Sequence, residues 1–177
     1  MKIFEDVKNW EKAATVYHQL GIMAHRQNLF KDAIDYCQKA VKIREETQNW
    51  YKAADGYYVL GMVAQALQLF EEAFNYYQKA FVIFQNFQDW YKIPLVLMGL
   101  GNILENQSNW TEAVKSYVQA LNIDLQHNQE WFDLLIKGLA RILMQVGENE
   151  FKVIWRDVTG EECAGEVREV IWAARDS

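Results

Sequence analysis

The sequence contains three histidines and two cysteines, residue types that can hold metals or act as nucleophiles. His18 and His25 stand seven positions apart, so they share a helix face without being adjacent, and His127 is remote. Because a zinc site needs three or four converging ligands, we expect no metal site at these histidines. Cys37 and Cys163 are far apart within helical patterns, so we expect two reduced thiols, with Cys37 as a small core residue and Cys163 unassigned.

Neighbouring carboxylates are the other candidates for chemistry, since two of them in a cleft can act as general acid and base. Nothing in the sequence places these pairs in a cleft, and their positions suit solvated helix faces or helix ends. The pairs are Glu45-Glu46, Glu71-Glu72 and Glu161-Glu162. The chain also lacks a glycine-rich phosphate loop, a nucleophile elbow and a paired-cysteine motif. We therefore expect a protein that is not an enzyme and that needs no cofactor.

The composition of the 177-residue chain favours one helical architectural unit. It is 51% hydrophobic but has nine glycines and a single proline, too little punctuation for many strands. A formal net charge of −6, without a basic cluster, argues against nucleic acid as a partner. No apolar run reaches the roughly 18 residues of a membrane span, and no secretory signal opens the chain, so we expect a cytoplasmic protein that does not contact membranes.

An internal repeat of 40 residues organises the chain. Residues 10–49 and 50–89 share 17 identities in 40 gapless positions. The recurring positions are Trp10, Trp50 and Trp90; Leu20-Gly21, Leu60-Gly61 and Leu100-Gly101; Phe30, Phe70 and Trp110; Ala33, Ala73 and Ala113; Ala40, Ala80 and Ala120; and Ile43, Ile83 and Ile123. Such a match exceeds what shared helical composition produces, so these units are true repeats.

Each repeat predicts two amphipathic helices joined by a tight polar turn, because its apolar and small residues recur at steps of three and four. We expect the two helices to be antiparallel and to approach closely at small residues such as Gly21 and Ala33. Pro94 lies near the start of the third repeat's first helix, where it cannot complete a regular helical hydrogen bond to Trp90. That helix should therefore begin later than its counterparts or be irregular at its start.

These repeats resemble the tetratricopeptide repeat (TPR) family over roughly residues 1 to 130. The family pattern falls on Tyr17, Leu20, Gly21, Ala24, Ala33, Cys37 and Ala40; on Tyr57, Leu60, Gly61, Ala64, Ala73, Tyr77 and Ala80; and on Leu97, Leu100, Gly101, Leu104, Ala113, Tyr117 and Ala120. Departures are Leu97 and Cys37 in place of aromatics, and a period longer than the family's usual 34 residues. The resemblance implies an all-α fold, a right-handed superhelical solenoid of helical hairpins with a C-terminal capping helix.

Among long TPR repeats, the phrases "YYVLGMVAQ" and "YYQKAF" are most similar to the C-terminal sensor arrays of bacterial NB-ARC and NACHT signalling ATPases. Kinesin light chains and the scaffold proteins that orient mitotic spindles have similarly long repeats. The predicted organisation is residues 1–9 as the tail of a truncated preceding repeat, 10–49, 50–89 and 90–130 as three repeats, 131–160 as a degenerate fourth, and 161–177 as a capping helix. After Trp131 the register shifts by one; Gly147 and Thr159-Gly160 end helices, and Val167, Val170, Ile171 and Ala174 form the packed side of the cap.

The resemblance also implies where a partner would bind, because the first helices of TPR repeats line a concave groove. The groove candidates carried over by position are His18, Ile22, Arg26, Tyr58, Met62, Gln65, Met98, Asn102 and Glu105. Only Arg26 and Asn102 fit the set with which some members clamp a terminal carboxylate. The other candidates suit an amphipathic segment better. We expect Tyr58 and Asn102 to be exposed, and Ile22 and Met62 either to line the groove or to pack against neighbouring helices.

Two functions fit this sequence. One is a non-catalytic scaffold or sensor module, the C-terminal part of a larger signalling protein, that binds a peptide or protein segment in its groove. The other is a free-standing adaptor or assembly factor that acts as a homodimer. If residues 1–9 are the remnant of a lost hairpin, Ile3, Phe4 and Val7 mark an apolar end through which the chain can self-associate.

Overall fold

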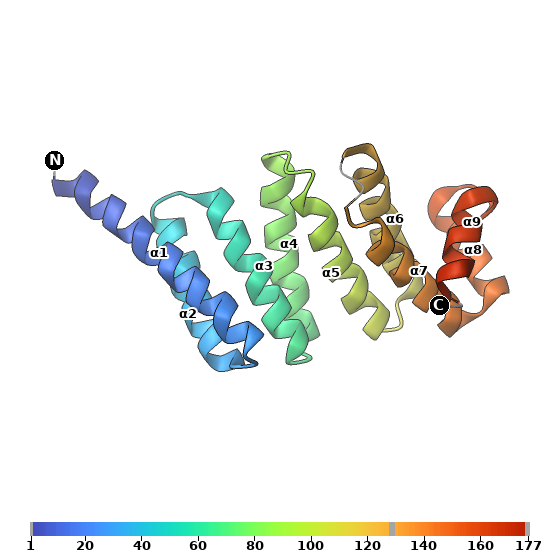
Figure 1. The fold of residues 1–177 in the computed structure, drawn as a ribbon, viewed down its shortest axis with the longest axis horizontal. Coiled ribbons are helices and arrows are strands. Elements are labelled where there is room, and N and C mark those ends of the chain that lie inside the picture. The colour runs from blue at the N-terminus through green and yellow to red at the C-terminus, as the bar shows by residue number, and fades with distance from the viewer. Residues whose placement is uncertain (1, 128–129, 176–177) are drawn as a thin grey trace. The chain divides into compact units, whose positions relative to one another are not determined.

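The structure, a computed structural model, describes residues 2–127 and 130–175, with side chains from residue 9 onward (Figure 1). Every regular element in this part of the chain is an α-helix, which confirms the all-α repeat fold. The chain divides into two compact units, Met1–Gln88 and Asp89–Ser177. Each unit is described by itself below.

The N-terminal unit consists of two helical hairpins. Its helices are α1 (Lys2–Arg26), α2 (Phe30–Glu46), α3 (Trp50–Ala66) and α4 (Phe70–Asn86). α1 packs on α2, α3 packs on α4, and α2 joins the two hairpins by packing on α3. The apolar stripes predicted from the repeat form the interface, with Ala14, Ala33, Ala53 and Ala73 fully buried.

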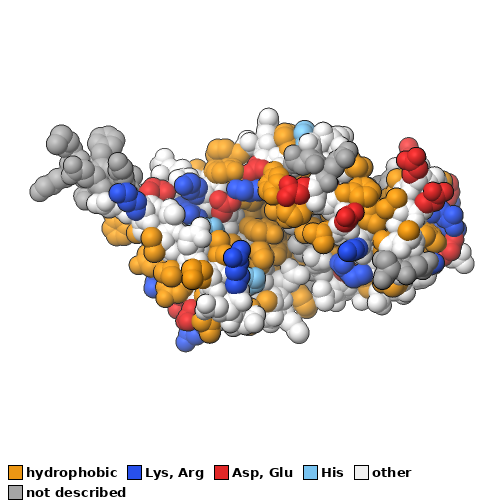
Figure 2. All heavy atoms as spheres, viewed as in Figure 1, with side chains coloured by type: hydrophobic (Ala, Val, Ile, Leu, Met, Phe, Trp, Pro, Cys, Tyr) orange, Lys and Arg blue, Asp and Glu red, His pale blue; other side chains and the backbone are white. Residues whose placement is uncertain are grey.

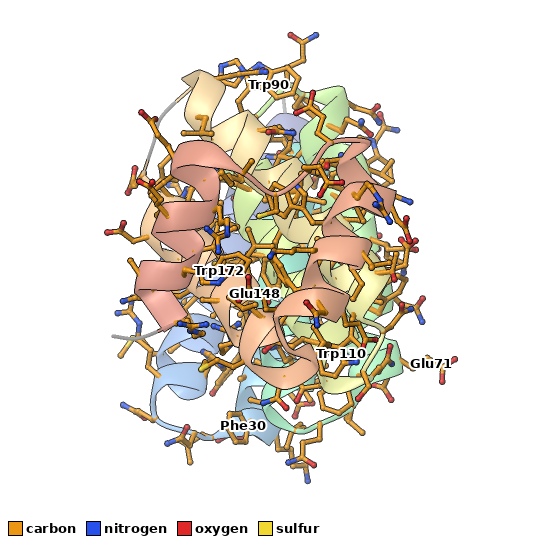
Figure 3. All side chains as sticks on the ribbon, turned by 90° about the vertical axis from the view of Figure 1, so that its right-hand side faces the viewer. Phe30, Glu71, Trp90, Trp110, Glu148 and Trp172 are labelled. Carbon is orange, nitrogen blue, oxygen red and sulfur yellow. The ribbon has the colours of Figure 1, made fainter. Side chains whose placement is uncertain are left out.

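The C-terminal unit begins with one further hairpin and ends in a less regular group. Its helices are α5 (Lys92–Asn106), α6 (Trp110–His127), α7 (Phe132–Val146), α8 (Glu148–Thr159) and α9 (Gly165–Arg175). α5 pairs with α6, while α7 packs against α6 and α9, and α8 contacts α6 and α7. Figure 3 shows Glu148 and Trp172 side by side, where the indole Nε1 donates to Oε2 of Glu148 at 3.3 Å and ties α9 to α8.

The turns between helices repeat every 20 residues, half the period found in the sequence. One residue in each of five turns has a positive φ, and none of them is glycine. They are Asn28, Gln48, Gln68, Gln88 and Ser108. In the first turn the amide of Leu29 donates to the carbonyl of Ala24 (2.8 Å) and that of Asn28 to His25 (3.0 Å), the double hydrogen bond of a Schellman motif. Turns within a repeat and turns between repeats therefore share one conformation.

The seam inside each hairpin depends on a glycine of the first helix. A Cβ on Gly61 would lie 2.7 Å from the ring of Tyr77, and one on Gly101 would lie 2.9 Å from the ring of Tyr117. A real side chain does not fit at such distances. Gly21 faces Cys37 in the first repeat, where the smaller thiol takes the place of the tyrosine ring.

The third repeat starts as Pro94 predicts. α5 begins at Lys92, two positions later than Trp50 in α3, and Trp90 and Tyr91 form a turn. Pro94 has no N–H to donate to the carbonyl of Trp90, so the helical ladder starts after it would otherwise. Oδ1 of Asp89 accepts from the amides of Tyr91 (3.2 Å) and Lys92 (3.0 Å) and satisfies the first turn.

Both ends of the chain differ from the sequence-based expectation. We expected a linker before Trp10, but α1 runs without a break from Lys2 to Arg26, because residues 2–9 continue the same helix. The assignment of residues 1–9 to a preceding repeat stays a prediction. At the other end, Gly147 and Gly160 end α7 and α8 as predicted, with positive φ values of 82° and 76°. α8 begins earlier than expected, at Glu148, and the last helix begins later, at Gly165.

Candidate functional site

A groove of about 510 Å³ lies between α1 and α3 in the N-terminal unit. It is lined by His18, Ile22, His25, Arg26, Asp55, Tyr58, Val59 and Met62. Five of the nine predicted groove residues are in this set. On the face that Figure 2 shows, hydrophobic side chains lie over α3 with histidine and basic side chains beside them. The structure thus brings together the predicted residues of the first two repeats.

The groove has an apolar wall formed by Ile22, Tyr58 and Met62, all half-buried. The ring of Tyr58 packs at 5.8 Å, centroid to centroid, on the ring of Tyr77 from α4. Burial raises the pKa of Tyr58, so its hydroxyl stays protonated near neutral pH and can donate a hydrogen bond. We expected Tyr58 to be exposed. It is only half-exposed because this stacking covers one ring face.

The polar side chains of the groove come mainly from the end of α1. Arg26 is exposed in the last turn, His25 is half-buried beside it, and His18 is 9% exposed. Burial, and then the nearby charge of Arg26, lower the pKa of His25, so its imidazole is neutral at pH 7. Asp55 adds one carboxylate from α3. The groove therefore offers an apolar wall with one fixed cation and several hydrogen-bonding groups.

Gln65 does not line this groove, because it takes part in the hairpin seam. The hydroxyl of Tyr77 donates to Oε1 of Gln65 at 3.0 Å. The spacing from Met62 gave no sign of this, since it depends on the tyrosine one helix away.

The predicted residues of the third repeat belong to a polar network in the C-terminal unit. Nε of Arg141, from α7, donates to Oε1 of Glu105 (2.9 Å), and its Nη2 donates to Oδ1 of Asn102 (2.9 Å). The hydroxyl of Tyr117 lies 2.7 Å from Oδ1 of Asn102 and 2.9 Å from Oε2 of Glu105, and it donates its single proton to one of them. Asn102 is half-buried in this network instead of exposed. Met98 is half-buried on the same helix.

Arg141 was missed by sequence reasoning, although it supplies the only cation of this network among the described residues. It lies after the register shift at Trp131, where positions can no longer be carried over from the earlier repeats. Because Asn102 already accepts from Arg141 and Tyr117, it is not available as the amide of a carboxylate clamp.

Two further searches of the described residues bear on function. No group of three or more histidine, cysteine or acidic side chains there is arranged to hold a metal ion. Among the same residues, no helix combines the length and the apolar character needed to cross a membrane.

Comparisons with known proteins extend this description. Residues 13–47 and residues 52–126 match models of the tetratricopeptide repeat, and together these segments make up more than half of the chain. No curated protein sequence matches the chain significantly.

Solved structures match the fold at low sequence identity. The apo form of RapI superposes with a TM-score of 0.74 at 14% identity, over 94% of this chain and 58% of RapI. BtubC (BKLC) from P. vanneervenii gives 0.71 at 18%, over 93% of this chain and 65% of BtubC. The Arabidopsis OM64 TPR domain gives 0.62 at 18%, over 77% of this chain and 99% of that domain. The chain is thus shorter than RapI and BtubC, and at these identities the likeness concerns the fold alone.

Proposed function

Because residues 13–47 and 52–126 belong to the tetratricopeptide repeat family, we propose that the chain is a non-catalytic protein-binding module. Its groove between α1 and α3 holds an amphipathic segment of a partner protein. The observation that carries this proposal is the groove itself, where Ile22, Tyr58 and Met62 form an apolar wall beside the cation of Arg26. An apolar side chain of the segment contacts the wall, and a carboxylate or a backbone carbonyl contacts Arg26.

The wider setting that we propose is a scaffold or sensor role in a cytoplasmic signalling protein of which this chain is the C-terminal part. It rests on the wording of the repeats, which resembles the sensor arrays of NB-ARC and NACHT ATPases and, less closely, kinesin light chains. The chain's span of 58% of RapI leaves room for such additional segments in a longer protein.

The groove can be tested with peptides selected from a random library on the full chain. A selected peptide should bind Met62→Lys at least about tenfold more weakly than the wild type, because a lysine head group in the apolar wall is desolvated without a partner. Val82→Lys is the matched control, since Val82 is 53% exposed on α4 and lies outside the groove. Equal binding by both variants, or an equal loss, would remove the groove from the proposal.

An exposed apolar stripe on α1 supports the alternative, a free-standing adaptor that acts as a homodimer. Val16, Leu20 and Met23 recur at helical spacing on one face and are 58%, 36% and 54% exposed. Ile3, Phe4 and Val7, the residues first expected to mediate self-association, lie outside the described side chains. Met23→Lys should then lower the mass measured by light scattering at high protein concentration, while Val82→Lys should leave it unchanged. A wild-type chain that stays monomeric at all concentrations would contradict this alternative.

A further inference from the structure

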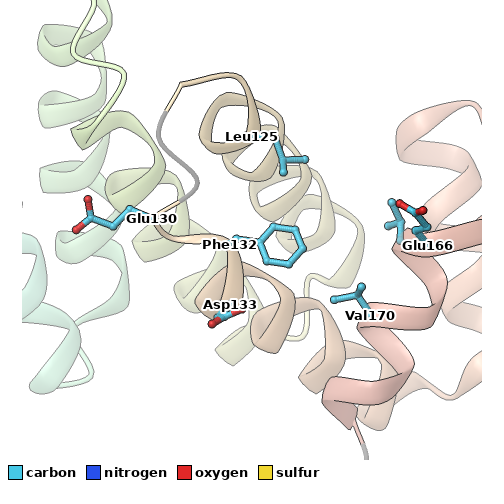
Figure 4. A pocket seen from close by; sticks show the side chains of 7 residues that line it. Leu125, Glu130, Phe132, Asp133, Glu166 and Val170 are labelled. Carbon is cyan, nitrogen blue, oxygen red and sulfur yellow. The ribbon is translucent and has the colours of Figure 1, made fainter.

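A second hollow, of about 440 Å³, lies within the C-terminal unit where α6, α7 and α9 meet. Its apolar part is formed by Leu125, Phe132, Val167 and Val170, and Figure 4 shows Phe132 and Val170 pointing toward each other across it. Leu125, Val167 and Val170 are 42%, 40% and 36% exposed. We call this hollow the α9 pocket. It presents an unusual concentration of uncovered aliphatic surface for a folded helical unit.

The α9 pocket exists because the last helix does not cover its neighbours as the sequence suggested. We expected Val167, Val170 and Ile171 to form the packed side of a cap. Only Ile171 is fully buried, whereas the two valines face the pocket. A helix that served only to cap the array would turn these side chains inward.

The polar side chains of the α9 pocket are all acidic. Glu130, Asp133 and Glu166 line it, and none of the described lining residues is basic. Oε1 of Glu130 accepts from the hydroxyl of Tyr91 at 3.1 Å. Within the described part of the chain, no ion pair engages Asp133 or Glu166. The apolar surface is thus bordered by carboxylates whose charge is directed to solvent.

The distribution of charge along the chain reinforces this local pattern. Residues 1–88 carry ten basic and ten acidic side chains, whereas residues 89–177 carry eight basic and fourteen acidic ones. The whole formal surplus of −6 therefore belongs to the unit that contains the α9 pocket. A surplus of this size attracts basic segments over a distance of about one Debye length, roughly 8 to 10 Å, and repels a second copy of the same unit.

We propose that the α9 pocket is a docking site for a basic amphipathic segment of a partner protein. The segment inserts an apolar side chain between Phe132 and Val170, and its lysine or arginine side chains lie opposite Asp133 and Glu166. Apolar burial supplies the affinity, while the carboxylates select the charge of the partner and raise the association rate. This site is separate from the groove between α1 and α3, which carries a cation and favours the opposite charge.

The test uses the full chain and two fluorescein-labelled helical peptides of equal length, one of leucine and lysine and one of leucine and glutamate. Fluorescence anisotropy should show binding of the lysine peptide only, and this binding should weaken as salt is added. Glu166→Gln should weaken it about two- to fivefold, the range for one exposed charge pair. Val170→Ser should weaken it at least about threefold through loss of apolar contact. Circular dichroism would establish that both variants keep the fold.

Glu169→Gln is the matched control, because Glu169 is exposed on the same helix but does not line the α9 pocket. It should leave the affinity within about 1.5-fold of the wild type. Equal losses for Glu166→Gln and Glu169→Gln would overturn the proposal, since the peptide would then respond only to the charge of the unit. So would an unchanged affinity in Val170→Ser, no binding of the lysine peptide, or equal binding of both peptides. A dimer that Val170→Ser dissociates would put a second copy in the pocket and would also overturn it.

Discussion

The ring of Tyr117 occupies the space that a side chain on Gly138 would need: a Cβ on Gly138 would lie 2.7 Å from Cε1 of the ring. The same ring lies against Gly101 of α5, where a Cβ would be 2.9 Å from Cε1. One fully buried tyrosine of α6 is therefore held between glycines of α5 and α7. Its hydroxyl reaches the network of Asn102, Glu105 and Arg141, so the packing of the ring and the position of the polar groups depend on each other.

We predict that Gly138→Ala destabilises the C-terminal unit by about 1 to 2 kcal/mol. Overpacking against the ring costs about 1 to 3 kcal/mol, and the better helix propensity of alanine offsets up to about 1 kcal/mol of that. Urea unfolding followed by circular dichroism measures the change. In a Tyr117→Leu background the ring is absent, so the same substitution should become neutral or stabilising. A cost that persists in that background would contradict the proposed clash.

The turns allow a prediction in the opposite direction, because five non-glycine residues adopt positive φ. Gln68 has a φ of 60°, a conformation that costs a residue with a Cβ about 1 kcal/mol relative to glycine. Gln68→Gly should therefore stabilise the N-terminal unit by about 0.5 kcal/mol or leave it unchanged after the entropy of the unfolded glycine is included. Gln38→Gly, at an exposed position inside α2, should instead destabilise by about 1 kcal/mol. Equal losses at both positions would show that the turn does not require the left-handed conformation in solution.

The sequence predicted the hairpins well because local pattern and long-range packing agree in the first three repeats. Its 20-residue turn period was also present in the sequence, as aromatics at positions 10, 30, 50, 70, 90 and 110, but the stronger 40-residue identity concealed it. The candidate groove was predictable only where repeat positions keep their meaning. Gln65 and Asn102 bond to tyrosines of a neighbouring helix, and Arg141 follows the register shift, so their roles depend on tertiary geometry that no single helix pattern encodes.

Position 124 offers a test of how the repeat junction changes along the chain. The equivalent positions 44, 84 and 124 hold arginine, phenylalanine and aspartate, and all three side chains are buried. Oδ1 of Asp124 accepts from the amides of Glu130 (3.2 Å) and Trp131 (3.1 Å), just before α7. Asp124→Ala should cost about 1 to 3 kcal/mol because it leaves these amides without their acceptor.

Asp124→Asn is the informative companion to this substitution. It keeps one acceptor oxygen, so it should cost clearly less than the alanine variant in the same urea titration. Asp157→Ala, an exposed substitution on α8, should stay within about 0.5 kcal/mol of the wild type. If Asp124→Ala were as mild as Asp157→Ala, the hydrogen bonds to α7 would not contribute to stability.

The contact between α8 and α9 should depend on pH through Glu148. Its Oε1 accepts from Nζ of Lys152 at 2.6 Å and from Nη2 of Arg168 at 3.4 Å, and its Oε2 accepts from the indole of Trp172. The hydrogen bond from Lys152, followed by that from Trp172, lowers the pKa of Glu148 to about 2 from its ordinary value of 4.5. Since the pKa in the folded state is depressed, the stabilisation is complete above pH 4.5 and disappears as the pH falls toward 2.

Glu148→Gln should accordingly lower the urea midpoint at pH 7, and the difference from the wild type should shrink between pH 4.5 and pH 2. Comparing the two proteins at each pH removes the general effect of acid on the rest of the chain. Glu150→Gln, an exposed carboxylate in the same helical turn, is the control and should show a smaller difference at pH 7. A wild-type-minus-variant difference that stays constant from pH 7 to pH 2 would mean that the charge of Glu148 does not hold α9 in place. In that case the indole of Trp172 and the ring packing of Phe151 against it, at 5.8 Å between centroids, would have to secure the last helix.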